Sequence, residues 1–133
     1  MNLFIILTIS VFLAALYPDV AKRSNEVQYL ADIEIEKLKT GAAIRGMFLN
    51  NSDEQVRFVY RLSMHKKGEA GRSSSNQGGF FIAEPGEKVS LSQISITLKD
   101  GDTYSINLKI FYGQELVAEK FIRSSFDISL NEM

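Results

Sequence analysis

The fold class is decided by one stretch, Val56–His65, which reads VRFVYRLSMH. Its even-numbered residues are all apolar, whereas its odd-numbered residues are mostly polar or basic. Strict alternation is typical of a half-buried β-strand, because successive strand side chains point to opposite faces, and it does not fit the helical repeat of 3.6. The stretch therefore predicts a strand with one face in a core and with Arg57 and Arg61 on the other face.

The same period of two recurs on both sides of this strand. Further strands are expected at residues 29–36, 43–49, 80–82, 89–98, 104–112 and 116–122. Turn-forming residues separate them, such as Pro85-Gly86, which suits the two central positions of a type II turn. After residue 21 no 12-residue amphipathic helix is apparent. The pattern predicts an all-β protein, a seven-stranded antiparallel immunoglobulin-like β-sandwich.

Two local features refine this prediction. The apolar positions change parity between Leu91 and Ile94, which indicates a β-bulge near Ser92-Gln93. Asp102 and Tyr104, at the entry to the penultimate strand, resemble a tyrosine corner, in which the tyrosine hydroxyl bonds to an upstream backbone group. The alternative is that Tyr104 only packs in the core.

The amino terminus has a different character. Residues 3–16 are almost continuously apolar, about the length of a signal-peptide core and shorter than the roughly 20 residues of a membrane span. We expect a signal peptide at 1–21, a flexible lead-in at 22–28, the folded domain at 29–123 and a tail at 124–133. No basic residue precedes the apolar run, so an uncleaved anchor is the alternative. Export without stable membrane insertion is the expectation.

Charge and composition limit the chemistry. The chain has 15 basic and 16 acidic residues; Asp19 is the one charged residue of 1–21, so 15 of each sign remain after it. A neutral domain gives no reason to expect nucleic-acid binding. The chain lacks cysteine, and His65 is its one histidine, so neither thiol chemistry nor a metal site is expected. Ser73–Ser75 lack the strand-turn-helix setting of a hydrolase nucleophile. We predict no enzyme activity and no cofactor.

Binding is better supported. Arg57 and Arg61 share one strand face, Arg45 is a candidate to join them from a neighbouring strand, and such a surface can hold an acidic or polar partner. The alternative is a solvated sheet face. The polar stretch that begins at Arg72, RSSSNQGGFF, offers no apolar face to fix its register. It is interpreted either as a loose hairpin loop or as a strand whose edge is offered to a partner.

The succession of RSSSNQGGF at 72–80, Pro85-Gly86-Glu87, Leu91-Ser92 and Gly101–Tyr104 resembles the curli assembly protein family CsgH. The resemblance covers about residues 29–122. The related CsgC proteins carry a Cys-X-Cys pair, which this chain lacks, so no redox role is carried over.

The resemblance implies a periplasmic chaperone that keeps the amyloid subunit curlin unpolymerised, with other curli secretion components as further candidate partners. Curlin repeats are rich in Ser, Gln, Gly and Asn, the residue types of 73–79. The hypothesised contact residues are Arg57, Arg61, Arg72, Ser73, Ser74, Ser75, Asn76 and Gln77. The alternatives are a structural subunit or adhesin of a surface fibre, and an accessory domain of an enzyme.

Overall fold

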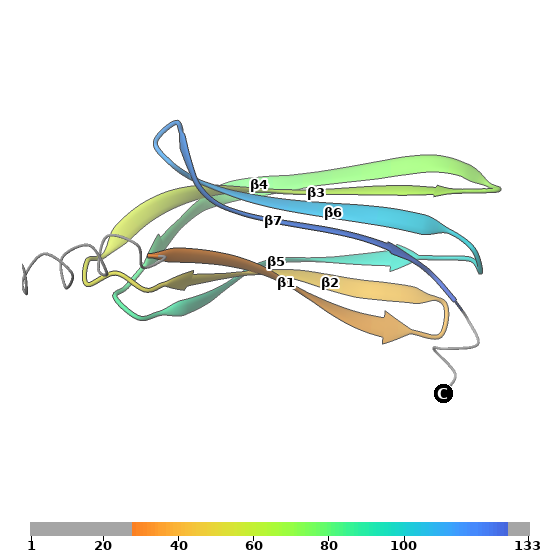
Figure 1. Cartoon of the computed structure of the whole chain (residues 1–133), viewed down its shortest axis with the longest axis horizontal. Coiled ribbons are helices and arrows are strands. Elements are labelled where there is room, and N and C mark those ends of the chain that lie inside the picture. The colour runs from red at the N-terminus through yellow and green to blue at the C-terminus, as the bar shows by residue number, and fades with distance from the viewer. Residues whose placement is uncertain (1–27, 128–133) are drawn as a thin grey trace, which may run out of the picture.

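The computed structural model describes residues 28–127, which form seven strands in two sheets (Figure 1). The strands are β1 (Tyr29–Leu38), β2 (Gly41–Asn50), β3 (Val56–Gly68), β4 (Gly71–Ala83), β5 (Lys88–Thr97), β6 (Thr103–Tyr112) and β7 (Glu115–Ser125). One sheet has the order β1-β2-β5 and the other the order β4-β3-β6-β7, and all pairings are antiparallel. The predicted immunoglobulin-like β-sandwich is confirmed. The predicted signal peptide, and the chain beyond residue 127, lie outside the described residues.

The core lies between the two sheets and follows the alternation in the sequence. The inward side chains of β3 and β6 are buried, with Leu62, Ile106, Leu108 and Ile110 fully inaccessible to solvent. An aromatic cluster closes one end, where the ring centres of Phe48 and Phe58 are 4.7 Å apart. Each such side chain contributes about 1.5–3 kcal/mol by its removal from water. With no disulfide in a cysteine-free chain, this core supplies most of the stability.

The turns and the bulge agree with the sequence. In the turn from Glu84 to Glu87, the Glu87 amide donates to the Glu84 carbonyl (3.0 Å) and Gly86 has a φ of 75°, as a type II turn requires. Between β2 and β5, Arg45 pairs with Gln93 but Met47 pairs with Ser90. One extra residue therefore sits in β5 just before Gln93, beside the predicted position of the bulge.

The polar stretch after β3 is more ordered than its composition suggested. Of the two interpretations of the stretch from Arg72, a loose hairpin loop or an edge strand, the structure shows the strand: β3 continues to Gly68 and β4 begins at Gly71, with only Glu69 and Ala70 in the turn. Every residue of β4 pairs with β3 without a register shift. Backbone pairing to a well-fixed neighbour is enough to make a strand, even where the side chains are small and polar.

The carboxyl end of the domain also extends further than predicted. β7 continues to Ser125, and Phe126 is buried, with 4% of its surface exposed. Its amide donates to the Asp102 carbonyl (2.8 Å), and its carbonyl accepts from the Gly101 amide (2.9 Å). The folded domain therefore runs past the expected boundary at residue 123.

Asp102 and Tyr104 are both buried next to this junction. The Asp102 carboxylate accepts a hydrogen bond from the Lys99 amide (2.9 Å), which closes the β5–β6 turn. Within residues 28–127 no hydrogen bond joins the Tyr104 hydroxyl to an upstream backbone group, so the expected tyrosine corner is not formed there. Tyr104 packs in the core instead.

At the end of the sandwich opposite to Asp102, the buried side-chain amide of Asn50 joins three segments. The Asn50 side chain is fully buried, and its Nδ2 donates to the carbonyls of Glu54 (2.8 Å), Ala83 (3.1 Å) and Glu84 (3.1 Å). Its Oδ1 accepts from the amide and the hydroxyl of Ser52. The end of β2, the loop before β3 and the end of β4 are thereby fixed together.

No helix among residues 28–127 has the length and apolar character needed to cross a membrane.

Candidate functional site

The candidate site is the outer face of the four-stranded sheet, which we call the basic face. Its side chains come from the odd-numbered residues of β3 and from their cross-strand partners, because the inward positions of β3 are taken by the core. The basic residues on this face are Arg57, Arg61 and Lys67 of β3, Arg72 of β4, Lys109 of β6 and Arg123 of β7. Glu119 of β7 is its one carboxylate.

The face changes in character along the strands. At one end, Phe80, Val59, Phe111 and Leu116 form an apolar row that crosses all four strands. Phe80 and Leu116 are exposed by 69% and 45%. The row exposes more apolar surface than scattered single residues would, and such patches mark interaction sites.

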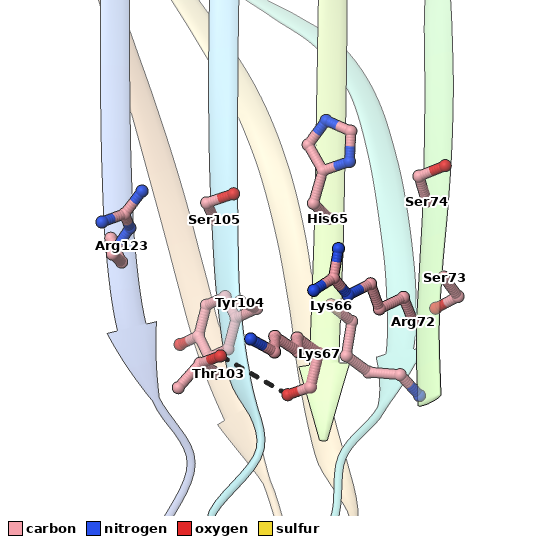
Figure 2. Close-up of a pocket in the computed structure, with 10 residues that line it drawn as sticks. All are labelled: His65, Lys66, Lys67, Arg72, Ser73, Ser74, Thr103, Tyr104, Ser105 and Arg123. Carbon is pink, nitrogen blue, oxygen red and sulfur yellow. Dashed lines mark hydrogen bonds between the residues drawn. The ribbon is translucent and has the colours of Figure 1, made fainter. Parts of the chain in front are cut away.

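At the other end the face is polar and basic. Ser74, His65, Ser105 and Arg123 form a cross-strand row, followed by Arg72, Lys67, Thr103 and Ser125. An open groove of about 740 Å³ lies over these rows, and Figure 2 shows side chains from β3, β4, β6 and β7 around it. At the floor of the groove, the Thr103 hydroxyl of β6 donates a hydrogen bond to the Lys67 carbonyl of β3 (3.4 Å).

Three arginines of the basic face lie against aromatic rings of the same face. The guanidinium of Arg57 is 4.4 Å from the centre of the Phe80 ring, and that of Arg61 is 5.6 Å from the Phe111 ring. Arg123 lies 5.7 Å from the Phe121 ring. All three distances are within the range of a cation–π contact. A stacked guanidinium keeps its N–H groups available for carboxylate or amide oxygens.

The six basic side chains of the basic face form no ion pair with a carboxylate within the described part of the chain. The ion pair recorded there joins Lys88 to Glu34 (3.8 Å), on the outer face of the other sheet. Asp32, Glu34 and Glu36 of β1 all project from that second face, which also carries Arg45 and Lys88. The two outer faces therefore differ in charge, and six cations without a carboxylate partner among the described residues lie together on the basic face.

The structure brings together some of the residues expected from the sequence and separates others. Arg57, Arg61, Arg72, Ser74 and Asn76 share the basic face. Ser73, Ser75 and Gln77 point to the opposite side of β4, because strand side chains alternate.

The expectation for Arg45 was wrong. It lies on β2 in the other sheet, where its Nη2 donates to Gln93 Oε1 (3.3 Å). Period-two alternation shows which way a side chain points in its own strand, but it does not show which strands become neighbours.

Sequence reasoning missed several contributors to the face, among them Lys109, Phe121 and Arg123. Lys109 alternates with buried residues of β6, so the sequence pattern gives its outward direction, but nothing placed β6 beside β3. The signal available in the sequence was that the outward residues of β3, β6 and β7, taken together, are rich in basic and aromatic side chains.

His65 is exposed on the basic face and is flanked across the strands by Ser74 and Ser105. Among residues 28–127, no three His, Asp or Glu side chains are grouped as metal ligands would be. What the site offers is an exposed surface of guanidinium, ammonium, hydroxyl and aromatic groups, suited to holding an extended polar chain.

Comparison with known proteins gives one family match. The family model described as CsgH protein matches residues 32–119 of the chain. No curated protein matches the sequence significantly.

Solved structures share the fold. The chain is similar to the E. coli curli protein CsgC, with a TM-score of 0.60 and 13% identity, over 70% of this chain and 96% of that chain. It is also similar to R. palustris CsgH, with a TM-score of 0.54 and 18% identity, over 78% of this chain and 96% of that chain. A β-glucuronidase of Bacteroides uniformis has a TM-score of 0.54 and 11% identity over 74% of this chain, but only 14% of the enzyme is covered. The last likeness is therefore to a small part of that enzyme.

Proposed function

The chain belongs to the CsgH family, whose model covers residues 32–119, and from this we propose that it is a periplasmic chaperone of curli assembly. Its client is the unfolded curlin subunit, and its action is to delay the polymerisation of curlin into amyloid. The fold is shared with a solved protein that is named a curli protein, which supports placing the chain in the same system.

The observation that carries the proposed mechanism is the basic face. It presents six basic side chains, Arg57, Arg61, Lys67, Arg72, Lys109 and Arg123, against the single carboxylate of Glu119. Arginine donates paired hydrogen bonds to carboxylate oxygens, and it also donates to the amide oxygens of Asn and Gln. An unfolded chain with such side chains can lie across the strands of this face and make many weak contacts.

Weak contacts at many points suit a protein that must release its client. Amyloid growth begins when several client segments align into a cross-β nucleus, and this nucleus is rare at first. A chaperone that binds client segments before they align reduces the number of nuclei. It can therefore act at amounts far below those of the client.

The test is a polymerisation assay with purified protein and freshly denatured curlin. Fibre growth is followed by the fluorescence of an amyloid-binding dye, with the protein far below equimolar amounts. We expect a longer lag before growth. An unchanged lag would overturn the proposed function.

The exposed edge of β4 favours one second candidate, a structural subunit of a surface fibre. Such a subunit would assemble with itself through that edge. Light scattering of the concentrated protein separates the two candidates, because the chaperone remains a small species whereas a fibre subunit grows with time and concentration.

A further inference from the structure

The four edges of the two sheets are not equally protected. Edge strands invite pairing with other chains, and proteins blunt them with charges, prolines, bulges or coverage by other elements. β1 and β7 are edges that lie against each other in the sandwich. β5 carries the bulge before Gln93. β4 has no such device apart from the charge of Arg72 at its beginning.

The edge of β4 is also long and regular. The strand has 13 residues, contains no proline, and pairs with β3 in one continuous register from Gly71 to Ala83. Two of its glycines, Gly78 and Gly79, leave the backbone approachable in the middle of the strand. Such an edge is a template for an added strand.

The direction of the free backbone groups follows from the ladder. The Asp102 carbonyl accepts a hydrogen bond from the amide of Phe126, which continues β7. The backbone N–H and C=O groups of successive residues alternate in direction along a strand. Even-numbered residues of β6 therefore direct these groups toward β7, and odd-numbered residues direct them toward β3. The odd-numbered residues of β3 that pair with β6 therefore face it, and the even-numbered ones face β4. In β4, consequently, the odd-numbered residues face β3. The N–H and C=O groups of Ser74, Asn76, Gly78 and Phe80 face the open edge.

The charge of this edge favours one kind of occupant. Between Gly71 and Ala83 there is no carboxylate, and Arg57, Arg61 and Arg72 stand on or beside the strand. A second copy of the chain added at this edge would bring the same cations together. An extended segment that is neutral or acidic meets no such repulsion.

We propose that the open edge of β4 takes up an extended segment of the unfolded client as an added β-strand, while the basic face beside it contacts the side chains of that segment. This proposal rests on the proposed function. The added strand shares backbone hydrogen bonds with the even-numbered residues of β4. A client segment so paired has one edge occupied, and that edge cannot pair with another client molecule.

The proposal is tested by amide hydrogen exchange of the ¹⁵N-labelled protein, alone and with freshly denatured, unlabelled curlin. In the free protein, we expect the amides of Ser74, Asn76 and Gly78 to exchange fast, whereas those of Ser75 and Gln77 should be protected by their hydrogen bonds to β3. With curlin present, we expect the first group to become slow and the second group to be unchanged. A delay of curlin polymerisation without any slowing at the even-numbered amides would overturn strand addition and leave the proposed function standing. No delay at all would overturn both.

A pair of variants provides an independent measurement. Asn76→Pro removes an N–H group that faces the open edge and leaves the β3 ladder intact, whereas Asn76→Ala removes only the side chain. We expect Asn76→Pro to need about tenfold more protein than Asn76→Ala for the same delay, because both variants lack the side chain and only the proline variant lacks the donor for a client carbonyl. Circular dichroism and the thermal midpoint establish that both variants are folded. Equal inhibition by two folded variants would overturn the proposal, and if Asn76→Pro does not fold, the exchange experiment decides.

Discussion

The guanidinium of Arg57 lies 4.4 Å from the centre of the Phe80 ring, which joins a β3 side chain to the exposed edge strand β4. The contact crosses the strands diagonally, since Arg57 is in register with Ile82. Phe80 is 69% exposed, so the arginine covers part of an aromatic surface that would otherwise face water. The charge of the basic face and its apolar row therefore form one surface.

Replacement of Arg57 and Arg61 by alanine is expected to weaken the inhibition of curlin polymerisation. The double variant removes two cations and two of the three Arg–Phe contacts from the basic face. We expect the protein concentration that doubles the lag to rise by about tenfold or more, since each charged hydrogen bond contributes roughly 1.5–3 kcal/mol.

The matched control for this variant is Arg45→Ala with Lys88→Ala. It removes the same charge from the outer face of the other sheet, where Arg45 bonds Gln93 and Lys88 pairs with Glu34. We expect it to inhibit as the parent does. Full inhibition by the Arg57/Arg61 variant would remove the basic face from the site.

Inhibition is also expected to weaken with salt. Cations without carboxylate partners act on a client through solvent, and the screening length falls from about 10 Å at 0.1 M to about 3 Å at 1 M ionic strength. The measurement is the lag ratio, with and without protein, over this range of salt. Each ratio uses curlin alone at the same salt, because salt itself changes fibre growth. A constant ratio would argue for contacts that are mainly apolar.

Asn50→Ala is expected to destabilise the fold without changing the basic face. The buried amide donates to the carbonyls of Glu54, Ala83 and Glu84, and its loss leaves them without that donor. We expect the free energy of unfolding to fall by roughly 1–3 kcal/mol or more, measured by urea unfolding. Asn51→Ala, an exposed neighbour, is the control. A stability equal to the parent's would show that water replaces the amide.

Gly68→Ala is expected to be costly although it adds one methyl group. A Cβ at Gly68 would lie 1.8 Å from Asp102 Oδ1, so the buried carboxylate would have to move away from the Lys99 amide. We expect a loss of about 1–3 kcal/mol in the free energy of unfolding. Glu69→Ala in the adjacent turn is exposed and should change stability by less than about 0.5 kcal/mol. An unchanged unfolding midpoint for Gly68→Ala would contradict this packing.

Phe126→Ala tests the extent of the folded domain. The side chain is buried in the core beyond the end of β7. We expect the free energy of unfolding to fall by about 3–5 kcal/mol. Ser125→Ala, at an exposed position, should be nearly neutral. A neutral Phe126→Ala would restore the boundary at residue 123.

Most of the fold could be predicted because side-chain alternation marks strands that bury one face. β3 and β6 are the clearest examples, with every second residue in the core from Phe58 to Met64 and from Tyr104 to Ile110, apart from half-buried Tyr60. β4 could not be predicted in full, because residues 71–79 bury little and are held by backbone pairing to β3. The order of β4 comes from its pairing with β3, and this pairing leaves no pattern of apolar side chains in the sequence.

The candidate site was predicted in part for the same reason. Arg57 and Arg61 lie on the strand with the strongest pattern, so their outward direction was clear. Arg45 was misplaced, and Lys109 and Arg123 were not connected to the site, because strand order is decided by the packing of whole sheets. Arg123 becomes a neighbour of Ser105 only through the pairing of β7 with β6.

The unequal charge of the two outer faces gives the described domain an electric dipole across its thickness. The full chain has a formal net charge of only −1 at pH 7, so its monopole attracts a charged partner weakly from a distance. A dipole does not attract an ion equally from all sides, but it turns the molecule as the ion approaches. An acidic chain would therefore meet the domain with β3 and β6 in front and with β1 behind, and productive encounters would be more frequent than for a randomly oriented neutral particle.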